Sequence, residues 1–370
     1  MKAKFFLLLL LPSCLSHTEN DFLKVFSETT TIRHSPVGVA PKDLPSAFQV
    51  AVIDTFLIVN HSSPKRDGSV FYFYSLNSNK KLGELLQINQ GDSLSACKIL
   101  GTTRWKVQSS HILFSYKNVM HTFQLPQQLS NTDCHFDTVL NYSSIKKVWS
   151  CTRLNDSIFI LWAAFKKGRV GILNAHTMQY KTYFGYPDSL TMKDVGDDVK
   201  TQFFQVRHTP HPDGERFAWV VVGDIFEILE YKNGNLSVIK GYYREMPKYF
   251  CKDSTITQNT IFPTAANAPH ITDTTKKAKD YIFSREHRRG LQSECGTKKY
   301  LYLLHSKATL GEAIYSTNTL LVFDWNGKPV KKYEMDIPVR GIFTNDDKIL
   351  YAVAEKNGKP LIVTFTLEGL

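Results

Sequence analysis

Two short segments of this chain carry residues whose types and spacing could do chemistry. The first is residues 207–213, in which His208, His211 and Asp213 offer two imidazoles and a carboxylate. Such donors bind zinc or iron, or could line a funnel-shaped active site. Two prolines make the segment extended, however, and Pro-Asp-Gly is a strong turn signal. We therefore predict a turn, keep the three residues as a candidate funnel or metal site, and expect no cofactor.

The second segment is the start of the chain, where Cys14 follows Leu-Pro-Ser. A basic start and an apolar run over residues 5–11 form the pattern of an export signal. The run is far too short for a spanning helix, which needs roughly 20 residues. Leu-Pro-Ser-Cys resembles a bacterial lipobox, so removal of residues 1–13 and acylation of Cys14 are predicted. A plain secretory signal is the alternative, although Leu11 fits its cleavage site poorly.

The charge of the chain constrains its partners. Loss of the signal leaves 43 basic and 34 acidic residues, a net charge of +9. Phosphate neutralisation would favour nucleic acid, but a lipid-anchored envelope protein rarely meets it, so no nucleic-acid partner is expected. We expect a cell-envelope location in the outer membrane of a Gram-negative bacterium, anchored by the N-terminal lipid. An envelope protein or an anionic glycan is the expected partner, and a merely solvated basic surface is the alternative.

Cysteine usage indicates neither a redox nor a zinc site. The mature chain keeps five cysteines besides Cys14, at positions 97, 134, 151, 251 and 295, and none forms a C-x-x-C pair. An odd number leaves at least one thiol outside any intramolecular disulfide. Buried, inert thiols are expected.

Short β-branched and aromatic runs recur along the chain, with hardly any helical periodicity. Polar turns rich in Asn, Asp and Gly separate these runs, and a strand–turn–strand order repeats in six groups. Four antiparallel strands per group, repeated radially, form a propeller, which leaves few exposed sheet edges. The sequence predicts an all-β fold, a six-bladed β-propeller of four-stranded antiparallel blades over residues 46–370. Five or seven blades remain open, because inserted loops blur the count.

The start of the mature chain is predicted to complete this ring. The last group has only three clear strands, and residues 22–32 are the one free strand-like segment before the propeller. Residues 14–45 are therefore expected to act as a lipidated tether and to supply the ring-closing strand. The alternative is that residues 22–32 are an unstructured tether.

Residues 251–299 form the longest irregular stretch, and their second half is strongly basic. Loops of this length are often functional or disordered. We interpret the stretch as an inserted loop that contacts an anionic partner, with a mobile solvated insertion as the alternative. Its candidate partner-binding residues are Lys276, Lys277, Lys279, Arg285, Arg288 and Arg289.

Three stretches resemble a known family. Residues 53–59 (IDTFLIV) are similar to its opening Asp-x-x-Leu-Leu-Val strand pair, and residues 299–306 (KYLYLLHS) to its Lys-Tyr-Ile-Tyr-x-Leu-Tyr-Ser strand. Residues 322–329 (VFDWNGKP) resemble a Phe-Asp-Trp-x-Gly-Lys-Pro turn in the penultimate blade. The chain resembles the TolB-like six-bladed β-propeller lipoproteins of Gram-negative anaerobes. The resemblance implies a fold and an address, but no reaction or ligand.

Two classes of function follow. The first is a non-catalytic envelope lipoprotein that uses its propeller to bind or scaffold a protein or glycan. The second is a propeller enzyme of hydrolase or lyase type, which needs acids and imidazoles from different blades to converge at the funnel mouth. No G-x-S-x-G, H-E-x-x-H or phosphate-binding glycine loop is present. Binding is favoured, and whether His208, His211 and Asp54 face one cavity discriminates between the two.

Overall fold

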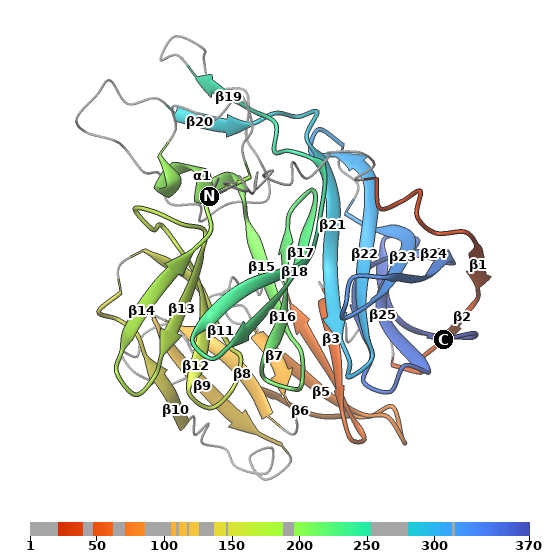
Figure 1. Ribbon diagram of the computed structural model, residues 1–370. Helices are drawn as coiled ribbons and strands as arrows, with labels where there is room; N and C mark the ends of the chain where they lie inside the picture. Colours follow the sequence, from red (N-terminus) through yellow and green to blue (C-terminus); the bar gives the residue numbers. More distant parts are fainter. Residues whose placement is uncertain are drawn as a thin grey trace, which may run out of the picture.

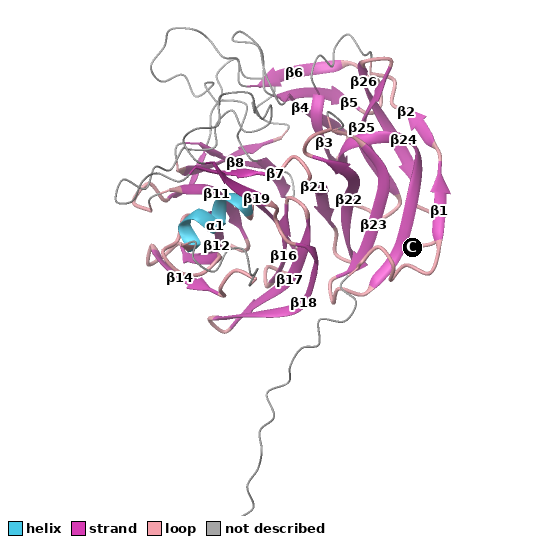
Figure 2. Cartoon of the chain, turned by 90° about the horizontal axis from the view of Figure 1, so that it is seen from above, coloured by secondary structure: helices cyan, strands magenta, loops and turns pink. Residues whose placement is uncertain are grey.

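A ring of β-sheets forms the body of the protein (Figure 1). The computed structural model describes residues 21–39, 47–61, 71–85, 105–108, 111–116, 118–125, 137–145, 147–187, 196–252, 280–312 and 315–370. Figure 2 looks onto the ring and shows the sheets arranged around a common centre. The four-stranded antiparallel blades predicted from the sequence are therefore present.

Blades one to three follow one another along the chain, and each is a separate four-stranded sheet. Blade one contains β3 (Ala47–Ile53), β4 (Phe56–His61), β5 (Phe71–Ser75) and β6 (Lys81–Leu85). Blade two contains β7 (Trp105–Gln108), β8 (His111–Tyr116), β9 (Val119–Gln124) and β10 (Asp137–Asn141). Blade three contains β11 (Val148–Arg153), β12 (Ile158–Ala163), β13 (Val170–Asn174) and β14 (Gln179–Tyr183).

Blades four to six complete the circle. Blade four contains β15 (Val206–Pro210), β16 (Arg216–Val221), β17 (Asp224–Lys232) and β18 (Asn235–Glu245). Blade five contains β21 (Arg288–Gly296), β22 (Tyr300–Thr309), β23 (Thr317–Asp324) and the first half of β24 (Pro329–Phe343). Blade six contains the second half of β24, β25 (Ile349–Lys356), β26 (Lys359–Thr366) and β2 (His34–Pro36). Because β24 runs unbroken from one blade to the next, blades five and six belong to one eight-stranded sheet.

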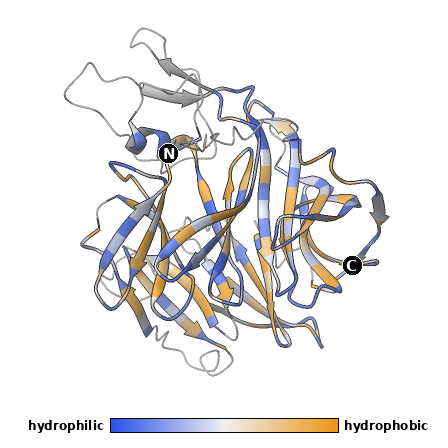
Figure 3. Cartoon of the chain, in the orientation of Figure 1, coloured by the Kyte–Doolittle hydropathy of each residue, from blue (hydrophilic) through white to orange (hydrophobic). Residues whose placement is uncertain are grey.

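The hydrophobic core is divided among the interfaces between blades. The buried apolar residues of the described chain form six clusters, and each cluster joins two neighbouring blades. Figure 3 shows apolar residues along the strands of the blades. Successive side chains of a strand point to opposite faces, so a continuously apolar strand such as β16 supplies residues to the clusters on both sides of its blade. Blades six and one share a cluster in which Val353 and Ile362 pack with Val50 and Leu57. The ring is thus closed by packing as well as by backbone pairing.

The predicted ring closure is correct in kind, but residues 22–32 are not the closing strand. The short strand β2 pairs antiparallel with β26 and supplies the fourth strand of blade six. The preceding strand β1 (Thr29–Ile32) pairs parallel with β24, at the outer edge of blade five. Phe22 is fully buried between blades four and five, against Phe226 and Tyr242. The segment predicted as one strand therefore fastens two other blades before β2 closes the ring.

The predicted insertion at residues 251–299 is shorter than expected. Residues 288–296 form β21, the first strand of blade five. Their sequence, RRGLQSECG, lacks an alternating apolar pattern, and Gly290 lies against the backbone of blade four. Just before β21, β20 (Asp280–Phe283) pairs antiparallel with β19 (Tyr249–Lys252). Residues 253–279 lie outside the described residues.

Two remaining features complete the fold. The helix α1 (Asp197–Phe203) precedes blade four. In the described part of the chain, no helix is long and apolar enough to cross a membrane. Cys151 and Cys295 are buried free thiols, as expected, and burial raises the pKa of Cys295 to about 12.

We expect loss of the N-terminal segment to open the ring. A soluble variant that begins at residue 37 lacks Phe22, β1 and β2, so the edge of β26 and part of an interblade core become exposed. Loss of a buried Phe alone typically costs about 3–5 kcal/mol. We predict a melting temperature roughly 5–10 °C lower, with aggregation at the exposed edge. A variant that begins at residue 21 is the matched control, and equal melting of the two variants would refute closure by this segment.

Candidate functional site

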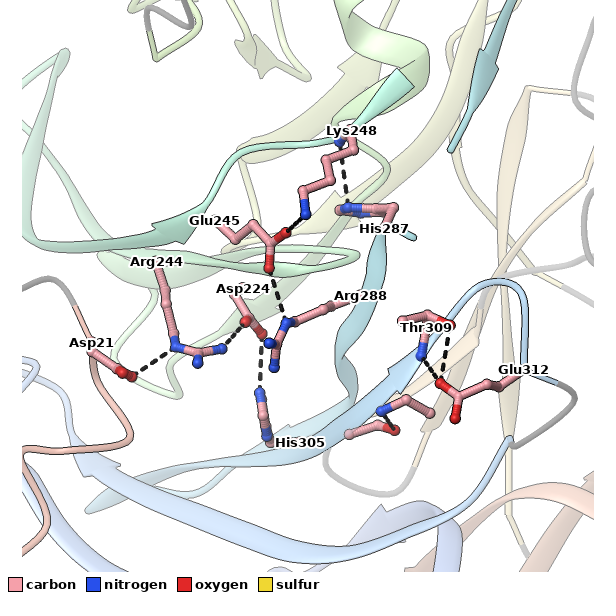
Figure 4. Close-up of polar contacts among 12 residues, drawn as sticks. Asp21, Asp224, Arg244, Glu245, Lys248, His287, Arg288, His305, Thr309 and Glu312 are labelled. Atoms are coloured by element: carbon pink, nitrogen blue, oxygen red, sulfur yellow. Dashed lines mark hydrogen bonds and ion pairs between the residues drawn. The ribbon is translucent and has the colours of Figure 1, made fainter. Parts of the chain in front are cut away.

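Charged side chains gather where blades four and five meet at their upper end in Figure 1 (Figure 4). Asp224 begins β17 and accepts a hydrogen bond from His305 Nε2 at 3.0 Å. Its second oxygen accepts from the Arg244 guanidinium, which also pairs with Asp21 at 2.7 Å. We call Asp21, Asp224, Arg244 and His305 the Asp224 network. It joins the N-terminal segment, two strands of blade four and one strand of blade five.

The Asp224 carboxylate is held in its ionised form. Asp224 and His305 are both fully buried. Desolvation by itself would raise the pKa of Asp224, but His305 and Arg244 outweigh it and hold the pKa below its ordinary value. A group so enclosed has no access to a substrate, so its described contacts support a structural role.

Two glycines allow the blades to approach at this point. Gly223 and Gly290 form an isolated parallel β-bridge beside Asp224, and both have positive φ, 119° and 57°. A Cβ on Gly290 would lie 2.1 Å from the carbonyl group of Gly223 and 2.6 Å from Asp224 Oδ1. Only a residue without a side chain fits this space and this backbone conformation.

A second buried ion pair links blades three and four. Arg169 Nη2 lies 2.7 Å from both carboxylate oxygens of Glu227, and Tyr243 donates its hydroxyl to the same carboxylate. Burial raises the pKa of Glu227, and Arg169 opposes that rise. The guanidinium carbon of Arg169 also lies 4.7 Å from the ring centroid of Trp219. Hydrogen bonds and aromatic contact therefore hold the pair in place, although Arg169 Nε is buried without a hydrogen-bond partner.

More exposed charges surround the Asp224 network. Glu245 accepts from Lys248 Nζ at 2.7 Å and from Arg288 Nε at 3.1 Å. His287 accepts from the Lys248 backbone N–H at 3.4 Å, and burial lowers the pKa of this imidazole. These contacts fix the entry of the chain into β21.

The predicted basic residues differ in exposure and pairing. Arg285 is exposed, as expected, whereas Arg288 is half-buried and paired with Glu245. The prediction of Arg289 as a surface residue is wrong, because this side chain is only 7% exposed. It donates to the carbonyl oxygens of Thr309 and Glu312 and lies over the ring of Tyr315. Lys276, Lys277 and Lys279 lie outside the described residues.

The predicted imidazole–carboxylate cluster lies in the lower part of blade four. His211 Nδ1 lies 2.8 Å from Asp213 Oδ2, and its Nε2 lies 2.9 Å from the Lys298 carbonyl oxygen. Asp213 also accepts two backbone N–H groups within the turn, and these bonds with His211 and Arg216 hold its pKa low despite partial desolvation. The expected turn is therefore present after β15, and the His211 imidazole connects it to blade five, whereas residues 207–210 form part of that strand.

No metal cluster is formed by the residues described. His208 is buried in β15 beside Phe217, while His211 lies in the turn after that strand. Asp54 occupies the β3–β4 turn of blade one, with a φ of 52°. Among the side chains that the structure describes, no group of three or more His, Cys, Asp or Glu could hold a metal ion.

The VFDWNGKP stretch forms a turn that locks two blades together. Gly327 has a φ of 81°, and the Asp324 carboxylate accepts the N–H groups of Asn326 and Lys328. Trp325 is buried, donates its indole N–H to the Thr297 carbonyl at 2.9 Å, and packs against the His211 ring. The stretch therefore has a structural role, because it holds blade five against blade four.

The family model described as TolB-like 6-blade propeller-like matches residues 43–347. The chain belongs to this TolB-like propeller family. The match runs from residue 43 to the turn after β24 and so includes blades one to five and the first strand of blade six. No curated protein matches the chain.

Several solved structures are similar to this TolB-like chain at low identity. The β-propeller domain of Cps50 (Swd1) from Myceliophteria thermophila is 8% identical and covers 87% of this chain and 96% of its own, with a TM-score of 0.39. The N-terminal domain of Nup159 is 12% identical and covers 92% and 100%, with a TM-score of 0.38. Raptor from Chaetomium thermophilum is 10% identical and covers 92% and 29%, with a TM-score of 0.41. The family assignment rests on the sequence match.

Sequence reasoning did not find the Asp224 network of this TolB-like propeller. A signal was available, because Asp224 and Glu227 interrupt the apolar run of β17, and His305 interrupts that of β22. Charged residues in a buried strand require partners. The partners themselves were not readable, since Asp224 and His305 are 81 residues apart.

We predict that Asp224→Asn destabilises the fold by about 3 kcal/mol, because it leaves the Arg244 charge without its buried partner. The folded pKa of Asp224 is lowered, so its contribution is complete above the unfolded pKa and is lost as pH falls through the folded value. The difference from wild type should therefore be constant near neutral pH and shrink in acid. Urea unfolding between pH 3 and 7 measures it.

Asp336→Asn is the matched control for this experiment. Asp336 forms an ion pair with His34 in which both side chains are partly exposed. Such pairs contribute about 0–1 kcal/mol. Equal losses for the two variants, or a loss for Asp224→Asn that grows in acid, would contradict the assigned role of Asp224.

Proposed function

We propose that this TolB-like propeller is a lipid-anchored cell-envelope protein that binds or scaffolds a partner and catalyses no reaction. The observation that carries the proposal is that its candidate acid–base side chains are buried and paired. Asp224, His305 and Glu227 are fully buried and paired with one another or with arginines. A catalytic acid or base must reach its substrate. The described groups that resemble such residues instead hold blades together.

The imidazole–carboxylate turn supports the same proposal. Both ring nitrogens of His211 are within hydrogen-bond distance of Asp213 or the Lys298 carbonyl, and the ring packs on Trp325. Asp54 lies in a different blade. A funnel enzyme would need these groups to converge on one point.

The position of Asp21 supports an anchored orientation. Asp21 is fixed to Arg244, and the adjacent Phe22 is buried between blades four and five. Seven residue steps separate Asp21 from Cys14, which reach at most about 25 Å at roughly 3.5 Å per residue. A lipid on Cys14 would therefore keep the upper end of blades four and five near the membrane, in the envelope of a Gram-negative bacterium.

We predict that Cys14→Ala releases the protein from membranes. Intact-mass measurement of membrane-extracted wild type should show an acyl modification on Cys14, because several chains give firm anchoring where one is marginal. The variant should appear in the soluble fraction with an unchanged melting temperature. Wild-type protein that is soluble and carries no lipid mass would contradict the anchor.

We predict that Arg285, an exposed basic residue in the turn before β21, contributes to partner binding. Arg285→Glu should weaken retention on immobilised alginate, an anionic glycan, by about two- to fivefold at low salt, since exposed charges act over roughly 10 Å at 0.1 M. Lys348→Glu is the matched control, because it reverses an exposed charge in the turn between β24 and β25 of blade six. Arg289 is left unchanged because it is buried. Equal retention of wild type and Arg285→Glu would show that Arg285 does not contribute to glycan binding.

A further inference from the structure

The outer edge of blade four is a long strand, and no strand in the described part of the chain pairs with its outer side. This strand, β18, has 11 residues, whereas the outer strands β6, β10 and β14 of blades one to three have 5 each. Figure 2 shows β18 on the rim of the ring. An edge strand presents unpaired backbone N–H and C=O groups, so another strand can add to it.

The protein covers two other outer edges in this way with its own N-terminal segment. The strand β1 pairs with β24 at the edge of blade five, and β2 pairs with β26 in blade six. These added strands have only 4 and 3 residues. We propose that the edge of β18 binds an extended acidic segment of a partner protein. The proposal rests on the proposed binding function and names a partner class for it.

The turn before β18 fixes which of its backbone groups point outward. Asn233 and Gly234 have positive φ, 52° and 78°, which is typical of a two-residue hairpin turn. In such a turn the flanking residues, here Lys232 and Asn235, form a hydrogen-bonded pair. Hydrogen-bonded and non-hydrogen-bonded pairs then alternate along the antiparallel ladder.

This alternation directs the backbone groups of Leu236 and Val238 away from β17. Leu236 is paired with Tyr231, and the Tyr231 N–H donates to the Glu215 carbonyl at 2.8 Å, on the side of β17 that faces β16. The pair is therefore of the non-hydrogen-bonded kind, as the turn requires. Leu236 and Val238 thus offer N–H and C=O groups to an added strand, which is the basis of recognition by strand addition.

Exposed lysines lie on the blade-five side of this edge. Lys240 is exposed on β18. A Cβ on Gly327 would lie 2.5 Å from the Lys240 side chain, so the turn between β23 and β24 is in contact with it. Lys328, the next residue in that turn, is also exposed. Two cations therefore lie near one another beside β18.

A third exposed lysine lies on the blade-three side. Lys181 Nζ is 4.8 Å from the ring centroid of Tyr183, and the Tyr183 hydroxyl donates to the Gly234 carbonyl at 2.9 Å. Among the ion pairs of the described residues, none includes Lys181, Lys240 or Lys328. Positive charge thus borders the edge on both sides.

These charges select the occupant. Lys232 at the hairpin tip is paired with Glu215 at 3.5 Å, and Glu230 lies one strand further in, on β17. The three lysines nearest the edge therefore favour carboxylates on an added strand. Two β18 edges paired with each other would bring the lysines of both copies together, and like charges across a strand pair are destabilising. Charge thus disfavours a second copy of the chain.

The test is fluorescence anisotropy with a labelled peptide of four Glu-Val repeats, which is acidic and rich in a strand-forming residue. It should bind wild type, and a peptide of four Lys-Val repeats should not. Binding should weaken as salt rises from roughly 0.1 to 0.5 M, because exposed charges are screened. The Glu-Val peptide with methylated backbone nitrogens should bind about tenfold more weakly or worse, since it cannot donate hydrogen bonds to β18.

Val238→Pro tests the edge from the side of the protein. It removes an N–H that points away from β17, and proline is tolerated on edge strands whose N–H faces solvent. Binding of the Glu-Val peptide should fall by about tenfold or more, because an added strand loses a hydrogen-bond donor and meets the proline ring. Val238→Thr keeps the N–H and a β-branched side chain, so this matched control should bind like wild type.

Lys240→Glu tests the charge. It should weaken binding by about two- to fivefold at 0.1 M salt and less at higher salt. Lys348→Glu, which reverses an exposed charge in blade six, should leave binding unchanged. Thermal melting of each variant shows whether it is folded, and the methylated peptide tests the edge on wild type without any substitution.

Absence of binding to the Glu-Val peptide, or equal binding of the Glu-Val peptide and its methylated form, would overturn the proposal. Dimerisation of peptide-free wild type that Val238→Pro abolishes would also overturn it, because the edge would then belong to a second copy. Each of these results would leave the membrane and alginate experiments unaffected, so failure of the β18 edge is distinguishable from failure of the proposed function.

Discussion

A ring of radially packed sheets requires that its first and last blades be joined, and this constraint governs the rest of the structure. Each blade buries apolar residues on both faces, so every blade needs two neighbours. The three residues of β2 satisfy the constraint by covering the edge of β26, which would otherwise be open to another chain. Residues of both blades then line the apolar cluster between blades six and one.

The N-terminal segment does more than close the circle. Phe22 fills the interface between blades four and five, β1 extends blade five, and β2 completes blade six. A segment of 16 residues from Asp21 to Pro36 thus contacts three consecutive blades. An anchor on Cys14 would connect the membrane directly to this part of the ring, where the Asp224 network also lies.

The buried charges are better understood as positioning elements than as sources of stability. Removing charges from water costs several kcal/mol per ion, and a buried pair often does no more than offset that cost. Their geometry is specific, however. Asp224 requires His305 and Arg244 in fixed places, and the close approach of Gly223 and Gly290 leaves no room for another arrangement. The network therefore fixes the approach of blade four to blade five.

The sequence by itself determined the fold class and most of the strands of this TolB-like propeller. Asp54 divides β3 from β4 as predicted, and Gly327 makes the turn that the VFDWNGKP stretch indicates. These features are local: period-2 alternation and turn residues act within about ten neighbours. The turn predicted from Pro-Asp-Gly is likewise present, whereas residues 207–210 before it belong to the strand β15.

Only the tertiary structure decided which residues close the ring and which charges are exposed. β2 is too short to show a pattern, and the RRGLQSECG sequence of β21 does not alternate between apolar and polar residues. Arg289 looks like a surface residue in a basic run, yet contacts from a turn about 20 residues further along bury it. Asp224 finds His305 across 81 residues of chain. Such pairings depend on how blades are placed around the ring, and the local preferences of a residue contain no information about a partner in another blade.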